Sequence, residues 1–470
     1  MSKVSFDGEA ESSADVIVLG AGPAGLGAAY KAAAAGRKVM VFERADGVGG
    51  LAASFEVSGI RVDHGSHRLH QATPPHILDE LKSLMGADLQ ERRRNGRIYL
   101  EGRWIKFPLQ FGNLIKNLPP SFALAAGRDA VMAWSRSPAS ETFAGVLEAS
   151  LGPTMSERFY FPYARKLWGL EPEAIHPEQA RRRVSGNAAS KLLRRVAARS
   201  ETAGLFYYPR RGFGQIWEAL AGGFLEKGGD LRLGSAVRSV ESHSKGLRVL
   251  LGSGEAVSAP QVWSTVPMPL LAQMADPPPP AGVLEAAGKL RTRAMLLVYL
   301  VLNTDRFTGY DAHYLPGPST PVTRISEPKN YRRAAEPPDR TVLCAELPCF
   351  VGEPIWGETE DALGEIVLDT LRRMQLPSPR PEFVHVKRVP SAYPVYDLDY
   401  EESFTTLAEW VDSIPGLLSF GRHGGFVHNN SHHALEMGWA AAEALGSSGD
   451  FDSSAWAASL QGFADHVVED

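Results

Sequence analysis

The chain has little cysteine, with only Cys344 and Cys349 among its 470 residues. Two thiols cannot make a disulfide framework, so the composition favours a reducing compartment and we expect a cytoplasmic protein. No apolar run is long enough to cross a bilayer, and residues 1–15 are too polar and acidic for a signal or transit peptide. These absences argue against a disulfide scaffold and predict no transmembrane segment.

A strong excess of charge of one sign is also lacking, because the formal net charge is only −5. The short basic runs Arg92–Arg94 and Arg181–Arg183 are typical of solvated helix faces, so we expect no nucleic-acid partner. The stretch Phe111–Ala125 is apolar, but a lysine and two prolines interrupt it. There a buried helix is favoured over peripheral membrane contact.

The segment from Asp15 to Gly50 is the most informative part of the chain. The apolar run Val16–Leu19 predicts a buried parallel strand, and the alanine-rich Leu26–Ala35 predicts a helix that stops at Gly36. A second strand and a second glycine turn follow. This order of elements is the one that a dinucleotide-binding βαβ unit requires.

The glycine spacing in the first turn supports the same interpretation. Gly20 allows the tight turn, Gly22 lets the backbone approach a pyrophosphate, and Gly25 lets the helix lie close to the sheet. Glu43 closes the second strand, where an acid can hold a ribose hydroxyl pair. An ordinary glycine-rich strand–helix turn is the alternative, but five elements in the right order favour a nucleotide site.

The length of the chain predicts two domains. Residues 12–74, 206–270 and 395–450 have the pattern of a nucleotide-binding domain. Residues 75–205 and 271–394 form the second, substrate-binding domain, which is mostly helical from Pro75 to about Ala198. Because a simple nicotinamide dehydrogenase has one contiguous nucleotide half, the split domain favours a flavin.

Hydrophobic periodicity predicts the other main elements. They are a hairpin of Ile98–Leu100 and Trp104–Phe107, helices at Gln215–Lys227, Asp361–Met374 and Ala434–Leu445, a small meander before Val262–Thr265, a proline-rich linker or rigid loop at 275–282, and strands at Ala294–Leu302, Val322–Ile325, Val342–Leu347 and Phe383–Val389.

Motifs along the whole chain resemble one family of enzymes. They are GAGPAGLGAAY, FERADGVGG, DHGSHRL, SAVRSVE, WSTVP and GRHGGFVHNNSHHALEMGWAAAEAL. The chain resembles the FAD-dependent amine oxidase superfamily, in the branch of protoporphyrinogen oxidase and phytoene-desaturase-like enzymes. RRNGRIYLEGRWIKFPL is similar to UDP-galactopyranose-mutase-like proteins of the same broad group. The resemblance implies an α/β fold: a Rossmann-like FAD-binding domain (GR2 type) assembled from discontinuous segments, plus a mixed α+β substrate domain with a helical insertion.

The resemblance also implies which residues bind FAD. They are Gly20, Gly22, Pro23, Ala24 and Gly25 at the pyrophosphate, Glu43 with Arg44 at the adenosine ribose, Gly49, Gly50 and Leu51 near the diphosphate or isoalloxazine, Val237 at the adenine through its backbone, Gly421 and Arg422 at the ribityl–phosphate segment, and Met437 and Gly438 at a helix facing flavin N1 and O2. A helix N-terminus suits that last place because reduced flavin is anionic at N1.

The substrate side is less defined. His67 and Arg68 line it by resemblance, or they are satisfied structural polar groups. Tyr393 and Tyr396 form aromatic walls of the pocket, or they are packed core tyrosines. The closing motif contains a polar cluster, some members of which lie at the flavin edge by resemblance: His423, His428, Asn429, Asn430, His432 and His433. Asn430 or Ser431 caps the following helix, and Ser431 is preferred as the cap.

Two further sets of residues are weaker candidates. His64, His67 and His70 have a spacing of three, but they lie on extended chain, so we expect no metal site. Trp168, Arg210, Arg211 and Arg324 are the other substrate-side candidates, and an arginine pair there suits a carboxylate or phosphate.

The predicted function is that of an FAD-dependent oxidoreductase in biosynthesis. It would dehydrogenate a small organic substrate, at CH–CH, CH–N or CH–OH, by hydride transfer to flavin N5, and oxygen or another electron acceptor would reoxidise the flavin. The alternative is a redox-neutral mutase or isomerase acting on a sugar nucleotide. A non-catalytic flavin-binding protein is a third possibility, and the sequence sets no oligomeric state.

Overall fold

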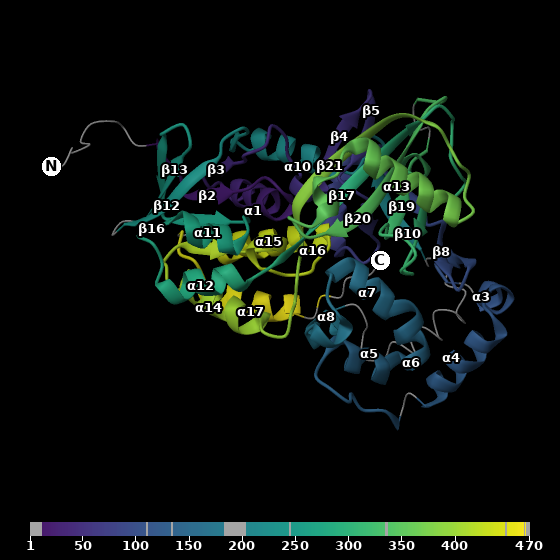
Figure 1. The fold of residues 1–470 in the computed structure, drawn as a ribbon. Helices are drawn as coiled ribbons and strands as arrows, with labels where there is room; N and C mark the ends of the chain where they lie inside the picture. Colours follow the sequence, from purple (N-terminus) through teal and green to yellow (C-terminus); the bar gives the residue numbers. More distant parts are fainter. Residues whose placement is uncertain are drawn as a thin grey trace.

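The computed structural model describes residues 12–109, 111–132, 135–182, 204–243, 246–333, 337–446, 449–464 and 466. Figure 1 shows two β-rich parts side by side, one around β2 and α1 and the other around β17 and β20, with a group of helices from α3 to α8 below the second part. The nucleotide site predicted from the sequence belongs to the first part.

A five-stranded sheet forms the centre of the first part. Its order is β11 (Asp230–Arg232), β3 (Val39–Phe42), β2 (Val16–Leu19), β15 (Gln261–Ser264) and β22 (Leu417–Ser419). Every pairing is parallel. The strands come from all three predicted nucleotide segments, and the predicted fold class is confirmed. The exact domain boundaries stay a prediction.

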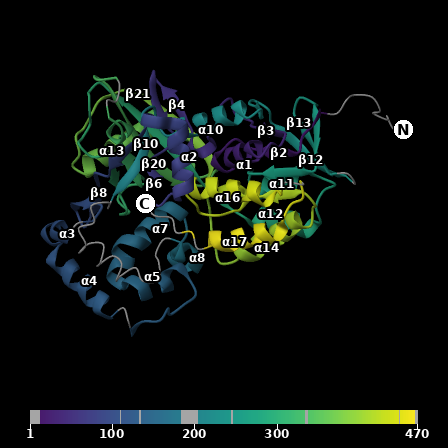
Figure 2. The same cartoon turned by 180° about the vertical axis from the view of Figure 1, so that it is seen from behind.

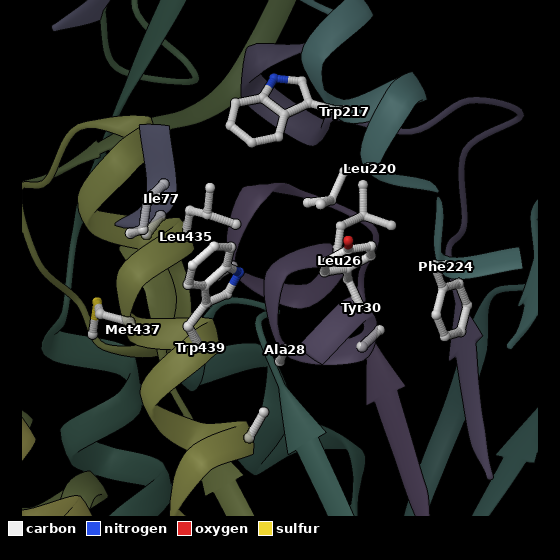
Figure 3. Packing of buried hydrophobic residues seen from close by; sticks show 14 of the residues in the cluster. Leu26, Ala28, Tyr30, Ile77, Trp217, Leu220, Phe224, Leu435, Met437 and Trp439 are labelled. Atoms are coloured by element: carbon white, nitrogen blue, oxygen red, sulfur yellow. The ribbon is translucent and has the colours of Figure 1, made fainter. Parts of the chain in front are cut away.

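Three helices pack together on one face of this sheet (Figure 3). They are α1 (Pro23–Ala34), α10 (Gln215–Glu226) and α16 (Ser431–Ala444). Glycines let α1 and α16 approach closely, because a Cβ on Gly438 would lie 2.2 Å from the carbonyl oxygen of Ala24. The expected first residues of α1 and α16 each lie three residues after the observed ones, and helix ends are the least certain part of such predictions.

The other face packs on a second hydrophobic core. It includes α11 (Met268–Met274), α12 (Ala281–Lys289) and α14 (Tyr400–Asp412), together with a sheet of order β1-β14-β13-β12-β16. The strands of that sheet are β1 (Ser12–Ser13), β14 (Ala256–Ala259), β13 (Gly246–Leu251), β12 (Val237–His243) and β16 (Ala275–Asp276). Val283 of α12 shares this core with Ile17 of β2. Part of the segment assigned to the substrate domain therefore packs with the nucleotide sheet.

The second part contains a seven-stranded sheet. Its order is β21 (Pro381–Pro394), β17 (Thr292–Leu302), β20 (Thr341–Cys349), β19 (Arg324–Ser326), β18 (Ala312–Tyr314), β8 (Gly96–Leu100) and β9 (Arg103–Phe107). The predicted hairpin is β8–β9, and α13 (Glu360–Arg373) packs against β17 and β21. A hairpin of β4 (Ser54–Val57) and β5 (Ile60–Asp63) packs on this sheet. A three-stranded sheet, in the order β6 (Leu69–His70), β10 (Leu205–Pro209) and β7 (Leu89–Arg93), shares the hydrophobic core of the first part.

The helical insertion follows the β8–β9 hairpin. Its helices are α3 (Phe111–Asn117), α4 (Pro120–Met132), α5 (Phe143–Leu151), α6 (Pro153–Met155), α7 (Phe161–Trp168) and α8 (Pro177–Arg181). The predicted helical pattern over 183–198 lies outside the described residues. In α4 Phe122 is buried but Leu124 is 78% exposed, so the expected burial of this stretch is only partial. No helix in the described ranges combines the length and apolarity that crossing a membrane requires.

Two further helices complete the chain. Before β7 lies α2 (Pro75–Met85), which packs against α10. At the C-terminal end, α17 (Ser453–Ala464) lies along α16, as the view from behind shows (Figure 2).

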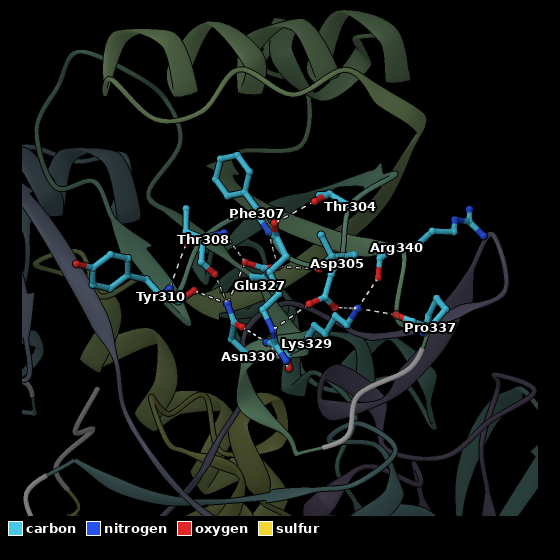
Figure 4. Close-up of polar contacts among 12 residues, drawn as sticks. Thr304, Asp305, Phe307, Thr308, Tyr310, Glu327, Lys329, Asn330, Pro337 and Arg340 are labelled. Carbon is cyan, nitrogen blue, oxygen red and sulfur yellow. Dashed lines mark hydrogen bonds and ion pairs between the residues drawn. The ribbon is translucent and has the colours of Figure 1, made fainter.

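A buried polar network fixes the segment after β19 (Figure 4). Glu327 accepts hydrogen bonds from the backbone N–H groups of Phe307 and Thr308, at 2.8 and 3.1 Å. Lys329 donates to Asp305 Oδ1 at 2.7 Å and to the carbonyl of Arg340 at 3.0 Å. Because the side chains of Glu327 and Lys329 are buried and satisfied, they hold the short helix that ends at Tyr331 in a single position.

Candidate functional site

The first glycine turn leaves the carboxyl edge of the parallel sheet. In the register Leu19 lies opposite Phe42 and Ser264, so Gly20 and Glu43 emerge side by side. Gly20 has φ +102°, which only glycine adopts without strain. Ligands of open α/β sheets bind at this edge.

The start of α1 is built for close approach. Gly22 is the N-cap of α1 and has no capping side chain, which leaves N–H groups of the first turn for a ligand. A Cβ on Gly22 would meet nothing within 4 Å, whereas one on Gly25 would lie 1.9 Å from the carbonyl oxygen of Gly20. Gly22 therefore borders open space, and Gly25 keeps the turn tight.

The second glycine turn meets the first. Gly49 donates its N–H to the carbonyl of Ala21 at 2.8 Å. Gly50 has φ +53°, and its Cβ position lies 3.4 Å from the Cα of Gly22. Leu51 follows in the short helix Gly50–Ala52. Two side-chain-free turns thus form one cradle, which fits a pyrophosphate.

Glu43 lies at the end of the cradle. Its carboxylate accepts the N–H groups of Ala21 at 2.8 Å and of Ala45 at 2.9 Å, so its orientation is fixed before any ligand arrives. Ser235 donates its N–H to the carbonyl of Glu43, which brings the start of β12, at Val237, to the same edge. Arg44 is exposed beside it. The adenosine contacts of Glu43, Arg44 and Val237 stay predictions.

The closing motif returns to the same turn. Gly421 has φ +82°, and a Cβ there would lie 2.8 Å from that of Ala24. Arg422 donates to the carbonyls of Asn429 and Ala392, and its guanidinium carbon is 5.2 Å from the centre of the Tyr393 ring. Arg422 is thereby fixed close to the cradle.

Asn429 is a candidate site residue that the sequence did not single out. It is only 2% exposed, and its Oδ1 has no hydrogen-bond partner among the described residues. An unsatisfied buried acceptor at the start of α16 fits a bound polar group. Membership of a polar cluster was its only signal in the sequence.

The start of α16 corrects one expectation. The helix begins at Ser431, and Asn430, not Ser431, is the N-cap, in a capping box with His433. Met437 and Gly438 lie about two turns into the helix and do not open it. Gly438 packs on α1, so any contact of these two residues with FAD stays a prediction.

His67 is a half-buried and constrained residue. Its Nε2 lies 2.9 Å from the carbonyl oxygen of His64, and its ring stacks on Phe213 at 5.3 Å. Burial lowers the pKa of His67, against an opposing effect of Asp63. His70 instead lies near His432, at 6.2 Å. The described residues contain no group of three or more His, Cys, Asp or Glu side chains placed to hold a metal ion.

The two tyrosines have different surroundings. Tyr396 is 3% exposed, donates to the carbonyl of Phe426 at 3.0 Å and stacks on Tyr400 at 4.1 Å. The packed-core interpretation therefore fits Tyr396. Tyr393 is half-buried beside Arg422, where a wall of the pocket is expected.

The weaker candidates are scattered. Arg210 pairs with Asp88 at 3.1 Å, and Arg211 is exposed, so this arginine pair does not converge on a ligand. Trp168 packs against Tyr393 at 5.9 Å. Arg324 makes hydrogen bonds of 2.8 Å to both oxygens of a carboxylate, that of Glu346, which the sequence did not indicate.

Buried histidines give the fold a predictable dependence on pH. Burial lowers the pKa of His64 and His423 to about 4, and that of His313 to about 3. The unfolded chain therefore takes up protons below pH 6.5 that the folded chain does not. The free energy of unfolding, and with it the melting temperature, is therefore expected to fall as the pH drops from 6.5 towards 4. Each such histidine lowers the free energy of unfolding by about 1.4 kcal/mol per pH unit in this range.

A single histidine tests this account. His313→Gln removes one of these groups in the substrate sheet, so the stability of this variant should fall less steeply between pH 6.5 and 5. Calorimetry over that range measures the slope. Identical slopes for the variant and the native chain would contradict the assignment.

Comparisons with known proteins agree with this geometry. The family model described as flavin containing amine oxidoreductase matches residues 23–445. AofH of Mycobacterium tuberculosis, named for flavin-containing monoamine oxidase activity, is 26% identical over 326 residues, covering 64% of this chain and 68% of AofH.

Two solved structures share the fold. Reduced UDP-galactopyranose mutase has a TM-score of 0.77 at 21% identity, covering 92% of this chain and 95% of that one. A protein from Exiguobacterium sp. 255-15 named for protoporphyrinogen oxidase activity has a TM-score of 0.71 at 18% identity, covering 93% and 99%. At these identities the likeness establishes the fold alone.

Proposed function

Because this chain belongs to the flavin-containing amine oxidoreductase family, we propose that its two glycine turns hold FAD and that it oxidises a small organic substrate beside them. The family predicted from the sequence is confirmed, and the chain is an FAD-dependent oxidoreductase. The meeting of Gly50 with Gly22 at the carboxyl edge of the sheet is the observation that carries the cofactor placement. The electron acceptor and the cytoplasmic location stay predictions.

The side chains around the cradle bind and orient. When bound, FAD supplies a two-electron acceptor, and the substrate chemistry depends on it. Glu43 holds the ribose, the N–H groups at the start of α1 face the diphosphate, and Arg422 supplies positive charge near the start of α16. His67 is held in place by stacking on Phe213.

The visible spectrum of the purified protein tests the proposal. Bound FAD gives a yellow protein, and a preparation that stays colourless after FAD is added contradicts the proposal. Anaerobic addition of candidate amines, alcohols or saturated C–C donors then identifies the substrate. Oxidation of a true substrate reduces the flavin, and reduction bleaches its visible absorbance. A flavoprotein that no donor class bleaches favours the non-catalytic alternative.

Replacing Glu43 tests the ribose contact. Glu43→Ala should weaken FAD binding by about 10- to 100-fold, since hydrogen bonds to a charged group contribute about 1.5–3 kcal/mol. Fluorescence titration of the apoprotein with FAD measures the dissociation constant. Asp46→Ala, an exposed acid in the same loop, is the matched control and should bind FAD like the native chain.

A redox-neutral mutase acting on a sugar nucleotide is the second candidate. The β8–β9 hairpin, whose sequence is mutase-like, joins the substrate sheet through β18, and Arg324 lies nearby in the same sheet. Such an enzyme would turn over only after reduction with dithionite, and no acceptor would be consumed. Turnover of the oxidised protein with consumption of an acceptor would rule it out.

A further inference from the structure

Arg68 occupies an unusual place for a guanidinium group. It follows His67 on the loop between β5 and β6, and its side chain is only 10% exposed. Its guanidinium carbon lies 4.5 Å from the centre of the Tyr331 ring and 5.4 Å from that of Phe206. The network around Glu327 and Lys329 fixes the helix that ends at Tyr331, so the aromatic platform is rigid.

The donors of Arg68 are largely unused. Nη1 makes one long hydrogen bond, 3.4 Å, to the hydroxyl of Tyr314. Nε and Nη2 have no hydrogen-bond partner among the residues that the structure describes. Nη2 lies 3.4 Å from Asp311 Oδ1, but neither atom is aligned for a hydrogen bond to the other. A buried cation with unsatisfied donors is costly unless a ligand or water meets them.

Further arginines surround the same tyrosine. Arg94 donates to the Tyr314 hydroxyl at 2.8 Å, and the guanidinium of Arg324 lies 5.8 Å from the Tyr314 ring. Arg324 is neutralised by Glu346. Among the residues that the structure describes, the three guanidinium groups of Arg68, Arg94 and Arg324 therefore face two carboxylates, those of Asp311 and Glu346. Positive charge exceeds negative charge within this described cluster.

The cluster is joined to the segment of His67, which is predicted to line the substrate side. Ser66 donates its N–H to Glu346 at 2.9 Å, and its hydroxyl is 2.7 Å from that of Tyr331. His67 and Arg68 follow directly in the chain. A group bound at Arg68 would thus be held next to the segment that lines the substrate side.

We propose that Arg68, with Arg94 and the Tyr314 hydroxyl, binds an oxyanion group of the substrate, a carboxylate or a phosphate. The forked, planar donors of arginine match both groups. This inference rests on the proposed function, because it places the substrate beside the FAD site. It defines the substrate class as anionic, in both the oxidase and the mutase alternatives.

Calorimetric titration of the FAD-loaded protein tests the site without turnover. Because FAD fills the pyrophosphate cradle of the loaded protein, inorganic pyrophosphate or benzoate can bind only at a second site. Binding of pyrophosphate alone indicates a phosphate substrate, and binding of benzoate alone indicates a carboxylate. Arg68→Met should weaken binding of the anion about 10- to 100-fold. Arg68→Lys should recover only part of this affinity, because lysine lacks the forked donors of a guanidinium group.

Arg97→Met is the matched control. Arg97 also stacks on aromatic rings, at 4.2 Å from Trp104 and 4.3 Å from Tyr310, but outside the cluster, so this variant should bind the anion like the native protein. If Arg68→Met does not fold, Tyr314→Phe replaces it and should weaken binding severalfold. Native protein that retains FAD but binds neither anion overturns this inference and leaves the cofactor proposal intact. The inference is also overturned if Arg68→Met, or Tyr314→Phe in its place, binds the anion as tightly as the native protein does.

Discussion

Gly25→Ala is expected to yield a protein that no longer retains FAD. A Cβ at this position would lie 1.9 Å from the carbonyl oxygen of Gly20, and this neighbour is backbone that no side-chain rotation can move. The start of α1 must therefore shift away from the end of β2. The shift opens the cradle formed by Gly22 and Gly50, so the dissociation constant for FAD should rise at least about tenfold, which corresponds to a loss of about 1.4 kcal/mol of binding free energy. The variant should therefore lose FAD on gel filtration under conditions in which the native protein keeps it.

Two alanine variants separate this effect from general damage. Gly22→Ala places a Cβ in open space, so its apoprotein should melt like the native apoprotein while FAD binding weakens. A Cβ on Gly222, within α10, would also meet nothing within 4 Å. Gly222→Ala should therefore lower neither the melting temperature nor the affinity for FAD. Full FAD occupancy in Gly25→Ala would show that the cofactor lies elsewhere.

The parts of the fold that sequence predicts are those with local causes. β2 has the predicted bounds, Val16–Leu19, because a short run of apolar, mostly β-branched residues that ends at a glycine turn is typical of a buried parallel strand. The glycine spacing predicted the turn and α1 for a similar reason: Gly20 has a positive φ, and Gly25 packs against the carbonyl of Gly20 five residues earlier. β17 and β20 were likewise visible as long apolar runs.

The parts that sequence missed depend on distant partners. β7 has the sequence LQERR, which has no apolar alternation, and it is a strand because it pairs with β10 more than a hundred residues later. α14 was missed as well, although its burial against α12 is clear in the structure. Asn430 and Ser431 are both good caps, and only the position of His433 decides between them.

The same distinction applies to the site. The FAD cradle is built from short-range motifs, and the sequence indicated both of its turns. The polar partners of the substrate side come from separate elements: Glu346 from β20, Tyr314 from β18 and Tyr331 from the segment after β19. Periodicity carries no information on which of them converge on Arg68. Their roles became visible only when the sheet brought them together.

Asp63 is the clearest case of such a distant partnership. It ends β5 and is 1% exposed. Its Oδ1 accepts hydrogen bonds from the Ser54 hydroxyl at 2.6 Å and from the N–H of Phe213 at 2.8 Å, and its Oδ2 accepts one from the hydroxyl of Tyr208. Burial and the Asp63 carboxylate raise the pKa of Tyr208 well above its usual value, so the tyrosine remains a donor. One carboxylate thus joins β4, β5, β10 and the loop before α10.

Asp63→Ala is therefore expected to lower the free energy of unfolding by about 3–5 kcal/mol, because it leaves two buried donors, from Tyr208 and Phe213, without an acceptor. Urea unfolding followed by tryptophan fluorescence measures this loss. Asp63→Asn keeps an acceptor, so its free energy of unfolding should fall by about half as much. Asp79 is an exposed acid on α2, and Asp79→Ala should have a free energy of unfolding within about 0.5 kcal/mol of the native value. Since Asp63 begins the segment that carries His67 and Arg68, the absorbance maximum of bound FAD should shift in Asp63→Asn. A native-like stability for Asp63→Ala would contradict the role of this carboxylate as the link between these elements.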